Sequence, residues 1–311
     1  MRKRKIFHLH LPTRTLTLGK RTLLMGVLNV TPDSFSDGGR FLAPDLAVER
    51  ALSLQRAGAD LLDIGAESTR PGSEGTSMVE ELRRLLPVLQ ALRGKLKIPI
   101  SIDTRKAGVA EIGIGAGAEI INDVSGLKYD PRIAEVAARR RVPLILMHMR
   151  GEPRTMQTAP FARNVMKDVT QGLRASIQKA RKVGVAKSQI IIDPGIGFGK
   201  SFQQNYKILQ RLPELAKLGH PLLVGTSRKG FLGRTLALAT GSAPGKAKTV
   251  PAEERIWATA ATVTASILGG AHIVRVHDVA EMAQVAVVAD CLLNPPASAP
   301  ANASALRRRK K

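Results

Sequence analysis

Short, continuous apolar runs alternate with longer amphipathic segments along most of the chain. The runs are rich in Val, Ile and Leu and lack polar alternation, which is typical of parallel strands covered on both faces. We expect strands at 22–29, 59–65, 98–103, 118–123, 142–148, 189–194, 220–226 and 271–277. Segments with a helical period lie at 46–57, 79–92, 106–115, 131–140, 165–183, 205–218, 253–268 and 279–292.

Eight strand–helix pairs in a chain of this length predict an α/β protein with a single (β/α)8 TIM barrel. A doubly wound open sheet is the alternative, but it should carry a Gly-rich phosphate turn, and "NVTPDSFSDGG" at 29–39 is not one. We expect the barrel over 21–292, a basic N-terminal extension over 1–20 and a disordered, basic low-complexity tail over 293–311. Residues 235–250 resemble an insertion between the seventh strand and its helix.

The composition predicts an aliphatic core and a basic surface. Hydrophobic residues make up 44% of the chain but aromatic residues only 3%. The net charge of +23 favours anionic substrates and nonspecific contact with nucleic acid. The basic runs at 2–5 and 307–311 are expected to be solvated tails, and the scarcity of aromatic residues argues against specific nucleic-acid binding.

The sequence favours a cytoplasmic protein without membrane contact. The single cysteine, Cys291, cannot form an internal disulfide, and we expect it in the core. Polar residues interrupt the N-terminal segment, so it lacks the continuous apolar core of a signal peptide. Residues 256–274 lack charge, but the Gly269–Gly270 pair and His272 favour a helix followed by a buried strand over a membrane span.

Nearly every expected strand ends in a polar residue, and barrel active sites lie at the carboxyl ends of the strands. Any one of these residues could be a helix cap or a paired core group. The whole set at one mouth predicts a polar ligand or a metal, because unpaired buried polar groups are costly. The set comprises Asn29, Asp63, Glu67, Asp103, Asn122, Asp123, His148, Asp193, residues 226–229, Arg275 and His277.

The residue types in this set suit two kinds of ligand group. Asp103, Asn122 and Asp193 offer carboxylate and amide edges to a flat heterocycle with amino and ring N–H donors. Lys229 could contact a ring carbonyl, and Arg275 could lie over the ring or hold a phosphate. A pocket suited to a phosphorylated group would comprise Asn29, Arg70, Arg275 and His277.

Two long segments, "MGVLNVTPDSFSDGG" (25–39) and "LLDIGAESTRPGS" (61–73), resemble the signature segments of the dihydropteroate synthase family. The motifs "SIDT", "IINDVSG", "LMHMRG", "DPGIGFGK", "GTSRKGFLG" and "VRVHDV" follow in the family's order. The resemblance covers about 22–286 and implies a transferase of folate biosynthesis. Such an enzyme condenses 6-hydroxymethyl-7,8-dihydropterin diphosphate with 4-aminobenzoate, giving 7,8-dihydropteroate and pyrophosphate.

The resemblance implies roles at the pterin ring. Asp193 would take the 2-amino and N3–H groups, and Asn122 and Asp103 would bind the remaining edge. Lys229 would meet O4 and N5, and Arg275 would stack on the ring. Asp103, Lys229 and Arg275 are the implied catalytic residues.

The resemblance also implies a site for the diphosphate and its metal. Thr69, Arg70, Arg275 and His277 would bind the phosphorylated end of the pterin substrate. Asn29 would hold Mg2+ together with the substrate phosphates, the usual arrangement for a hard cation with few protein ligands.

For 4-aminobenzoate, the resemblance implies a carboxylate site at Ser227 and the start of the helix near 228–230. The ring would pack on Pro71, Phe198 and the stem of Lys229.

Residues 30–39 would form a mobile loop that closes over the reacting carbon, with 67–73 as its partner. A surface Ω-loop is the alternative for 30–39. The implied mechanism is dissociative, with a pterin-CH2 cation stabilised by the ring and by Asp103, and 4-aminobenzoate would bind only after closure.

Two other functions are alternatives. A pterin-dependent methyltransferase of the same barrel type would not need Arg70, His277 or the 30–39 loop. A nucleic-acid-binding protein on a barrel scaffold would instead use the excess positive charge. A homodimer is expected by analogy with barrels of this type. The basic ends and residues 235–250 have no explanation in the resemblance.

Overall fold

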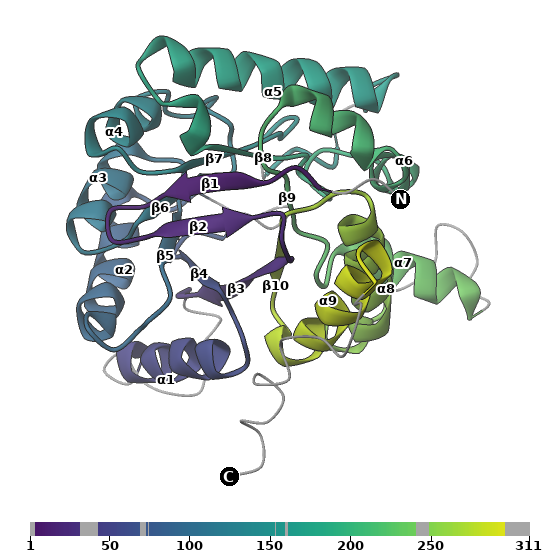
Figure 1. Ribbon diagram of the computed structural model, residues 1–311, viewed down its shortest axis with the longest axis horizontal. Helices are drawn as coiled ribbons and strands as arrows, with labels where there is room; N and C mark the ends of the chain where they lie inside the picture. Colours follow the sequence, from purple (N-terminus) through teal and green to yellow (C-terminus); the bar gives the residue numbers. More distant parts are fainter. Residues whose placement is uncertain are drawn as a thin grey trace.

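Eight parallel strands form the wall of a barrel in the computed structural model, with helices around its outside (Figure 1). The structure describes residues 4–31, 43–68, 73, 75–152, 154–158, 161–240 and 249–295. The sheet order is β8-β7-β6-β5-β4-β3-β10-β9, and a bridge between Ile192 and Leu222 brings its two edges together. The strands are β3 (Leu23–Asn29), β4 (Leu61–Gly65), β5 (Ile100–Asp103), β6 (Ile120–Asp123), β7 (Leu144–Met147), β8 (Ile190–Asp193), β9 (Leu223–Val224) and β10 (Ile273–Val276). Each lies inside an expected strand, and the predicted TIM barrel is confirmed.

The helices agree with the sequence pattern at most positions. The segment 205–218, expected as one helix, belongs to two elements. An α-helix begins after the Ser201 cap and ends at Gln210, and a 3-10 helix follows Arg211. The helix over 230–239 was not expected, so the prediction that an insertion begins at residue 235 is wrong. The helices are α1 (Ala43–Arg56), α2 (Met78–Leu92), α3 (Ala107–Gly115), α4 (Ile133–Arg140), α5 (Val165–Lys182), α6 (Phe202–Gln210), α7 (Gly230–Ala239), α8 (Ile256–Leu268) and α9 (Val279–Leu293), with short 3-10 turns η2 (Lys187–Gln189), η3 (Leu212–Leu218) and η4 (Glu253–Arg255).

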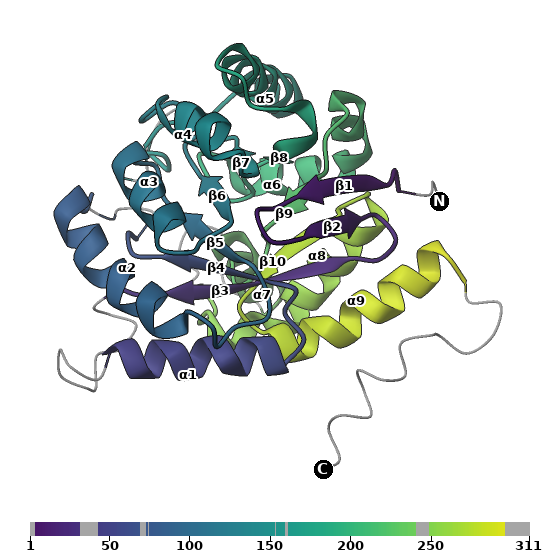
Figure 2. The same cartoon turned by 60° about the vertical axis from the view of Figure 1, so that its left-hand side comes forward.

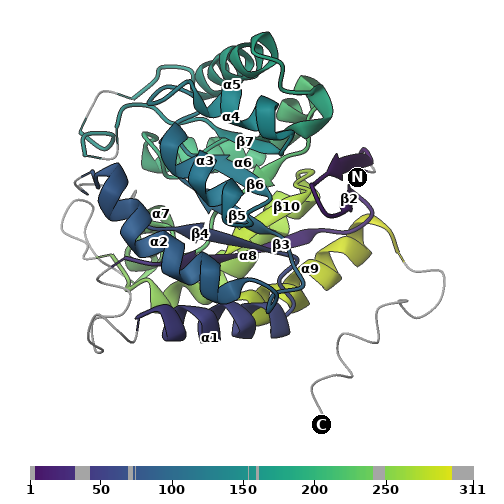
Figure 3. The ribbon, with the colours of Figure 1, turned by 90° about the vertical axis from the view of Figure 1, so that its left-hand side faces the viewer.

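The N-terminal extension is an antiparallel hairpin that covers one end of the barrel (Figure 2). Its strands are β1 (Phe7–His10) and β2 (Thr15–Leu18). Leu9 and Leu18 are fully buried and pack on residues at the amino ends of the barrel strands. In Figure 3 the hairpin lies on the right, whereas the amino end of α1, which follows the carboxyl end of β3, lies on the left. The hairpin therefore closes the barrel end opposite the expected site.

The expectation of a solvated basic run at 2–5 is wrong at Arg4. Its side chain is only 1% exposed, because it reaches from the hairpin to the barrel and α9. Arg4 Nη1 donates to Thr22 Oγ1 at 2.6 Å and to the Ala271 carbonyl at 2.8 Å, and Nη2 donates to Asp290 Oδ1 at 2.5 Å. Residues 1–3 and the tail from 296 onward lie outside the described residues.

Across the described ranges, none of the helices is both long and apolar enough to cross a membrane. The uncharged segment 256–274 is α8 followed by the buried strand β10, as its glycine pair predicted. Cys291 lies on α9 and is half-buried, so it is less enclosed than expected.

Candidate active site

Polar side chains from separate strands converge at the carboxyl end of the barrel, away from the hairpin. Parallel register places Asp103 beside Gly65 on one side and Asn122 on the other. A Cβ at Gly65 would lie 3.4 Å from that of Asp103, so glycine leaves room for this carboxylate. The residues that meet here are Asp63 on β4, Asp103 on β5, Asn122 on β6, Asp193 on β8, Lys229 after β9 and Arg275 on β10.

Arg275 occupies the centre of this arrangement and joins two carboxylates. Its Nε donates to Asp63 Oδ2 at 2.6 Å, and its Nη2 donates to Asp103 Oδ2 at 2.9 Å. Asn122 Nδ2 also donates to Asp63 Oδ2, at 3.0 Å. The guanidinium therefore fixes the relative positions of the carboxylates on β4 and β5, and Asp63 in turn holds Asn122 of β6.

Each of the two carboxylates retains one oxygen without a partner. Among the described residues, Asp63 Oδ1 and Asp103 Oδ1 are buried and accept no hydrogen bond. A buried acceptor left in this state costs about 1–3 kcal/mol. A ligand with several N–H donors would remove that cost, which supports the expected flat, nitrogen-rich heterocycle.

Burial shifts the pKa values of the ionisable groups at the mouth. Burial raises the pKa of Asp103 well above its usual range, although Arg275 opposes the shift. Burial also raises the pKa of Asp193 to about 6, opposed by the Gly195 N–H that donates to Oδ1 at 2.7 Å. Burial lowers the pKa of Lys229 to about 8, with Arg275 acting in the same direction. Strong shifts of several neighbouring groups are typical of functional sites.

Lys229 and Phe198 lie together, as the expected second-substrate site requires. Lys229 Nζ is 4.0 Å from the centroid of the Phe198 ring. Gly197 has a φ of 86°, and a Cβ there would lie 3.2 Å from Lys229 Cδ. Glycine at this position allows both the left-handed backbone and the close passage of the lysine stem.

Ser227 and His277 lie on neighbouring loops and contact each other. His277 Nδ1 is 3.0 Å from Ser227 Oγ, and the His277 backbone N–H donates to the same oxygen at 3.2 Å. Burial and the charge of Arg275 lower the pKa of His277 to about 3. His277 is therefore a neutral hydrogen-bonding group in this arrangement.

Asn29 ends β3 at the mouth and is half-buried. Within the described residues, its side-chain amide has no hydrogen-bond partner, and the nearby residues 32–42 lie outside them. The described chain offers no cluster of three His, Cys, Asp or Glu side chains that could hold a metal alone. Thr69, Arg70, Pro71 and residues 32–39 of the expected closing loop lie outside the described residues.

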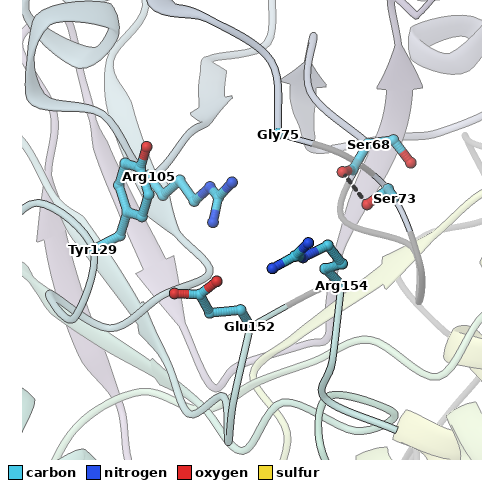
Figure 4. A pocket seen from close by; sticks show the side chains of 7 residues that line it. All are labelled: Ser68, Ser73, Gly75, Arg105, Tyr129, Glu152 and Arg154. Atoms are coloured by element: carbon cyan, nitrogen blue, oxygen red, sulfur yellow. Dashed lines mark hydrogen bonds between the residues drawn. The ribbon is translucent and has the colours of Figure 1, made fainter. Parts of the chain in front are cut away.

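Residues on the loops that follow β4, β5, β6 and β7 line a pocket (Figure 4). The guanidinium groups of Arg105 and Arg154 point into it, with Glu152 below them (Figure 4). Arg105 Nη2 donates to Glu67 Oε1 at 2.9 Å and stacks 4.2 Å from the Tyr129 ring centroid. These contacts fix the loop that leads into residues 69–72.

Sequence reasoning missed two features of the site. Asp63 was noted as polar but was given no role, although it contacts both Arg275 and Asn122. Lys200 was not singled out, although its buried ammonium donates to the carbonyls of His148 and Phe198 at 2.7 and 3.0 Å. The available signal for Asp63 was a charged residue inside an apolar strand. For Lys200 it was a lysine directly after a glycine-rich loop.

Comparisons with known proteins agree on one family. The family described as pterin binding enzyme matches residues 25–277. A dihydropteroate synthase of Synechocystis sp. is 49% identical over 274 residues, which are 88% of this chain and 91% of the relative. The structure of Xanthomonas albilineans dihydropteroate synthase with 4-aminobenzoic acid is 39% identical, with a TM-score of 0.83, and covers 94% of this chain and 100% of that chain. The same enzyme in complex with 7,8-dihydropteroate has a TM-score of 0.80 at 38% identity and covers 93% of this chain and 100% of that chain.

Proposed function

The chain belongs to the dihydropteroate synthases within the pterin-binding enzyme family, and from this premise we propose which of its residues carry out the reaction. It condenses 6-hydroxymethyl-7,8-dihydropterin diphosphate with 4-aminobenzoate to give 7,8-dihydropteroate and pyrophosphate, in folate biosynthesis. The observation that best supports the residue assignment is the pair of buried carboxylate oxygens of Asp63 and Asp103 around Arg275, which have no partner among the described residues. The match to dihydropteroate synthases over most of the chain argues against the pterin-dependent methyltransferase alternative.

The pterin ring binds in the barrel mouth. Asp193 accepts from the 2-amino and N3–H groups, and Asn122 and Asp103 bind the opposite edge. Lys229 donates to O4 and N5, and Arg275 lies over the ring. The inward position of all five side chains supports this arrangement, as does the acceptor character of the carboxylates.

The diphosphate is bound at the edge of the mouth by Thr69, Arg70, Arg275 and His277. His277 contributes an N–H donor rather than a charge, since its pKa is low. The half-buried Asn29 fits Mg2+, because its amide oxygen has no partner among the described residues and the substrate phosphates would supply the other ligands. When bound there, Mg2+ would offset the negative charge of the pyrophosphate.

The substitution is dissociative. The C–O bond breaks first, and pyrophosphate leaves with the bonding electrons. The exocyclic CH2 then carries positive charge, which the electron-rich ring delocalises and the nearby Asp103 carboxylate stabilises. The amine of 4-aminobenzoate attacks this carbon and loses a proton.

The second substrate binds beside Lys229. Its ring packs on Phe198, Pro71 and the stem of Lys229, and its carboxylate meets Ser227 and the start of α7. The contact of the Lys229 ammonium with the Phe198 ring supports this site. Residues 30–39 and 67–73 close over the site, so that binding follows occupation of the pterin site.

A pyrophosphate-release assay with both substrates tests these assignments. We expect Asp103→Asn and Lys229→Ala to abolish turnover with an unchanged circular dichroism spectrum, and EDTA to suppress the activity of the unaltered enzyme. Lys207→Ala on the exposed face of α6 is the matched control and should retain full activity. Normal turnover by both site variants would refute the residue assignment.

We also propose a homodimer through α8 and α9, which pack against each other. The exposed positions of α8 are Trp257, Ala261 and Ala265, which form one apolar stripe. Trp257 is 80% exposed, and Val288 and Leu292 on α9 are 62% and 51% exposed. A second copy of the chain would bury this apolar area, since large exposed apolar patches are rare on monomers.

Analytical ultracentrifugation tests the dimer. We expect two-fold mass for the unaltered chain and a monomer for Trp257→Asp, because burying a carboxylate in an apolar interface is costly. A monomeric unaltered chain would refute this proposal. We further propose a cytoplasmic location, supported by the single cysteine, which cell fractionation would test.

A further inference from the structure

Arg228 adopts a left-handed conformation between two residues assigned to substrate binding, Ser227 and Lys229. Its φ is 59°, in a region that non-glycine residues rarely occupy. The Lys229 N–H donates to the Thr226 carbonyl at 3.2 Å, so residues 226–229 form a tight turn with Arg228 at its third position. Glycine or asparagine is usual where a turn requires a positive φ. Other contacts must therefore offset the cost of arginine.

The backbone of Arg228 is held on both sides by residues that follow the turn in sequence. Its N–H donates to Thr259 Oγ1 on α8 at 3.1 Å. Its carbonyl accepts from Arg255 Nη1 at 2.7 Å. A Cβ at Gly233 of α7 would lie 2.5 Å from Arg255 Nε, so this glycine makes the room that the Arg255 guanidinium occupies.

The side chain of Arg228 joins the turn to the loop that follows β10. Its Nε and Nη2 donate to Asp278 Oδ2 and Oδ1 at 3.0 and 2.5 Å, a bidentate pair. The two side chains are only 30% and 14% exposed. Asp278 follows His277, and His277 contacts Ser227. The Ser227–His277 and Arg228–Asp278 contacts therefore connect the same two loops, the one after β9 and the one after β10.

We propose that Arg228 is a positioning residue that holds the 226–229 turn against the loop after β10 through its pair with Asp278. The left-handed conformation turns Ser227 and Lys229 toward the mouth together, and the ion pair fixes their distance from His277. In the more usual right-handed or extended conformation, the chain direction after Arg228 would change and Lys229 would leave the site. This inference rests on the proposed function, because only there do Ser227, Lys229 and His277 act on the two substrates.

The test compares Arg228→Gly with Arg228→Ala in steady-state kinetics with both substrates. Both variants lose the ion pair, but only alanine pays the steric cost of the positive φ. We expect kcat/KM for 4-aminobenzoate to fall roughly 10- to 100-fold in both, as for misplacement by about an ångström, with glycine the better of the two. The melting temperature of Arg228→Gly should fall because Asp278 loses its partner, but circular dichroism should show the variant still folded at the assay temperature. A positioning role predicts that kcat/KM falls by more than the folded fraction does, whereas a purely structural role would lower the two together.

A charge swap tests the pair directly. Asp tolerates left-handed backbone, so Arg228→Asp combined with Asp278→Arg can restore the contact. We expect the double variant to exceed both single variants in kcat/KM by at least roughly tenfold, as expected for a directly coupled pair. Asp278→Asn keeps the shape of the loop and one acceptor, so it should fold and show a smaller loss.

A matched control removes a similar pair away from the mouth. Arg211 forms a bidentate pair with Glu214, at 2.6 and 2.8 Å, and Arg211→Ala should leave kcat/KM unchanged. Activity of Arg228→Gly within about threefold of the unaltered enzyme, or a swap no better than the single variants, would overturn the proposal. Absence of turnover in the unaltered enzyme would instead contradict the proposed function.

Discussion

Replacement of Asp193 by asparagine should stabilise the ligand-free protein while it abolishes pterin binding. Asp193 is 6% exposed, and burial raises its pKa from 3.8 to about 6. One pKa unit corresponds to about 1.4 kcal/mol, so the ionised side chain costs the folded state roughly 3 kcal/mol at neutral pH. Asparagine carries no charge, and its carbonyl oxygen can still accept from the Gly195 N–H.

The effect has a defined pH dependence. Because the folded state holds the Asp193 proton to a higher pH than the unfolded state, the penalty is absent below about pH 4 and complete above about pH 6. We therefore expect Asp193→Asn to raise the free energy of unfolding by up to roughly 3 kcal/mol at about pH 8, and the gain to vanish near pH 4. Urea unfolding without ligand at both pH values measures this difference, and calorimetry with the pterin substrate measures the loss of binding.

Asp123 at the end of β6 provides the control for this substitution. Its carboxylate accepts from the Ser125 N–H, the Ser125 hydroxyl and the Leu127 N–H, at 2.8, 2.7 and 2.6 Å. Burial raises the pKa of Asp123 as well, so the substitution removes some charge penalty. However, the amide of Asp123→Asn cannot accept on both sides, and each buried N–H or O–H left without an acceptor costs about 1–3 kcal/mol, so this variant should be less stable. If Asp193→Asn were also destabilised at about pH 8, or still bound pterin normally, the reasoning from burial would be refuted.

The remaining predictions concern the closed end of the barrel and the order of binding. Arg4→Ala should lower the free energy of unfolding, measured in urea, by about 3–5 kcal/mol, because Asp290 loses a buried partner. Arg21→Ala breaks a half-exposed pair with Asp60, so it should lower the free energy of unfolding by less than about 1 kcal/mol. Equal losses for the two variants would contradict this distinction. In calorimetry, 4-aminobenzoate should bind poorly alone and tightly with pterin, pyrophosphate and Mg2+ present, and equal affinities would exclude ordered closure. Pterin affinity should weaken roughly tenfold between about pH 7 and pH 5 as Asp193 takes up a proton, and a flat profile would remove its assigned role.

The barrel could be predicted because its strands are buried on both faces and therefore appear as unbroken apolar runs. The hairpin was missed for the opposite reason. Its buried residues, such as Leu9 and Leu18, lie in short stretches with polar neighbours, and their packing partners lie far along the chain. Helix α7 was missed because Gly230 and Gly233 weakened the helical pattern, although Gly233 is needed for contact with Arg255.

The residues that converge at the mouth could be predicted because barrel active sites lie at the carboxyl ends of the strands. That prediction needs only the strand order and the last polar residue of each strand. It could not supply the contacts between them. Asp63 and Arg275 are 212 positions apart in sequence, and only the closed sheet brings them to 2.6 Å. The left-handed conformation of Arg228 is likewise invisible in the sequence, where an arginine beside Lys229 indicates only charge. The roles of Thr69, Arg70 and Pro71 stay predictions.

Among the described residues, the N-terminal hairpin closes the amino end of the barrel. Apolar side chains of the hairpin and of the barrel strands fill that end, so neither substrate nor product can pass along the axis there. Both reactants and both products must therefore use the carboxyl end, where the site residues lie. We therefore expect retained pyrophosphate to block binding of the next dihydropterin diphosphate. Release of product, rather than bond breaking, would then limit the turnover rate.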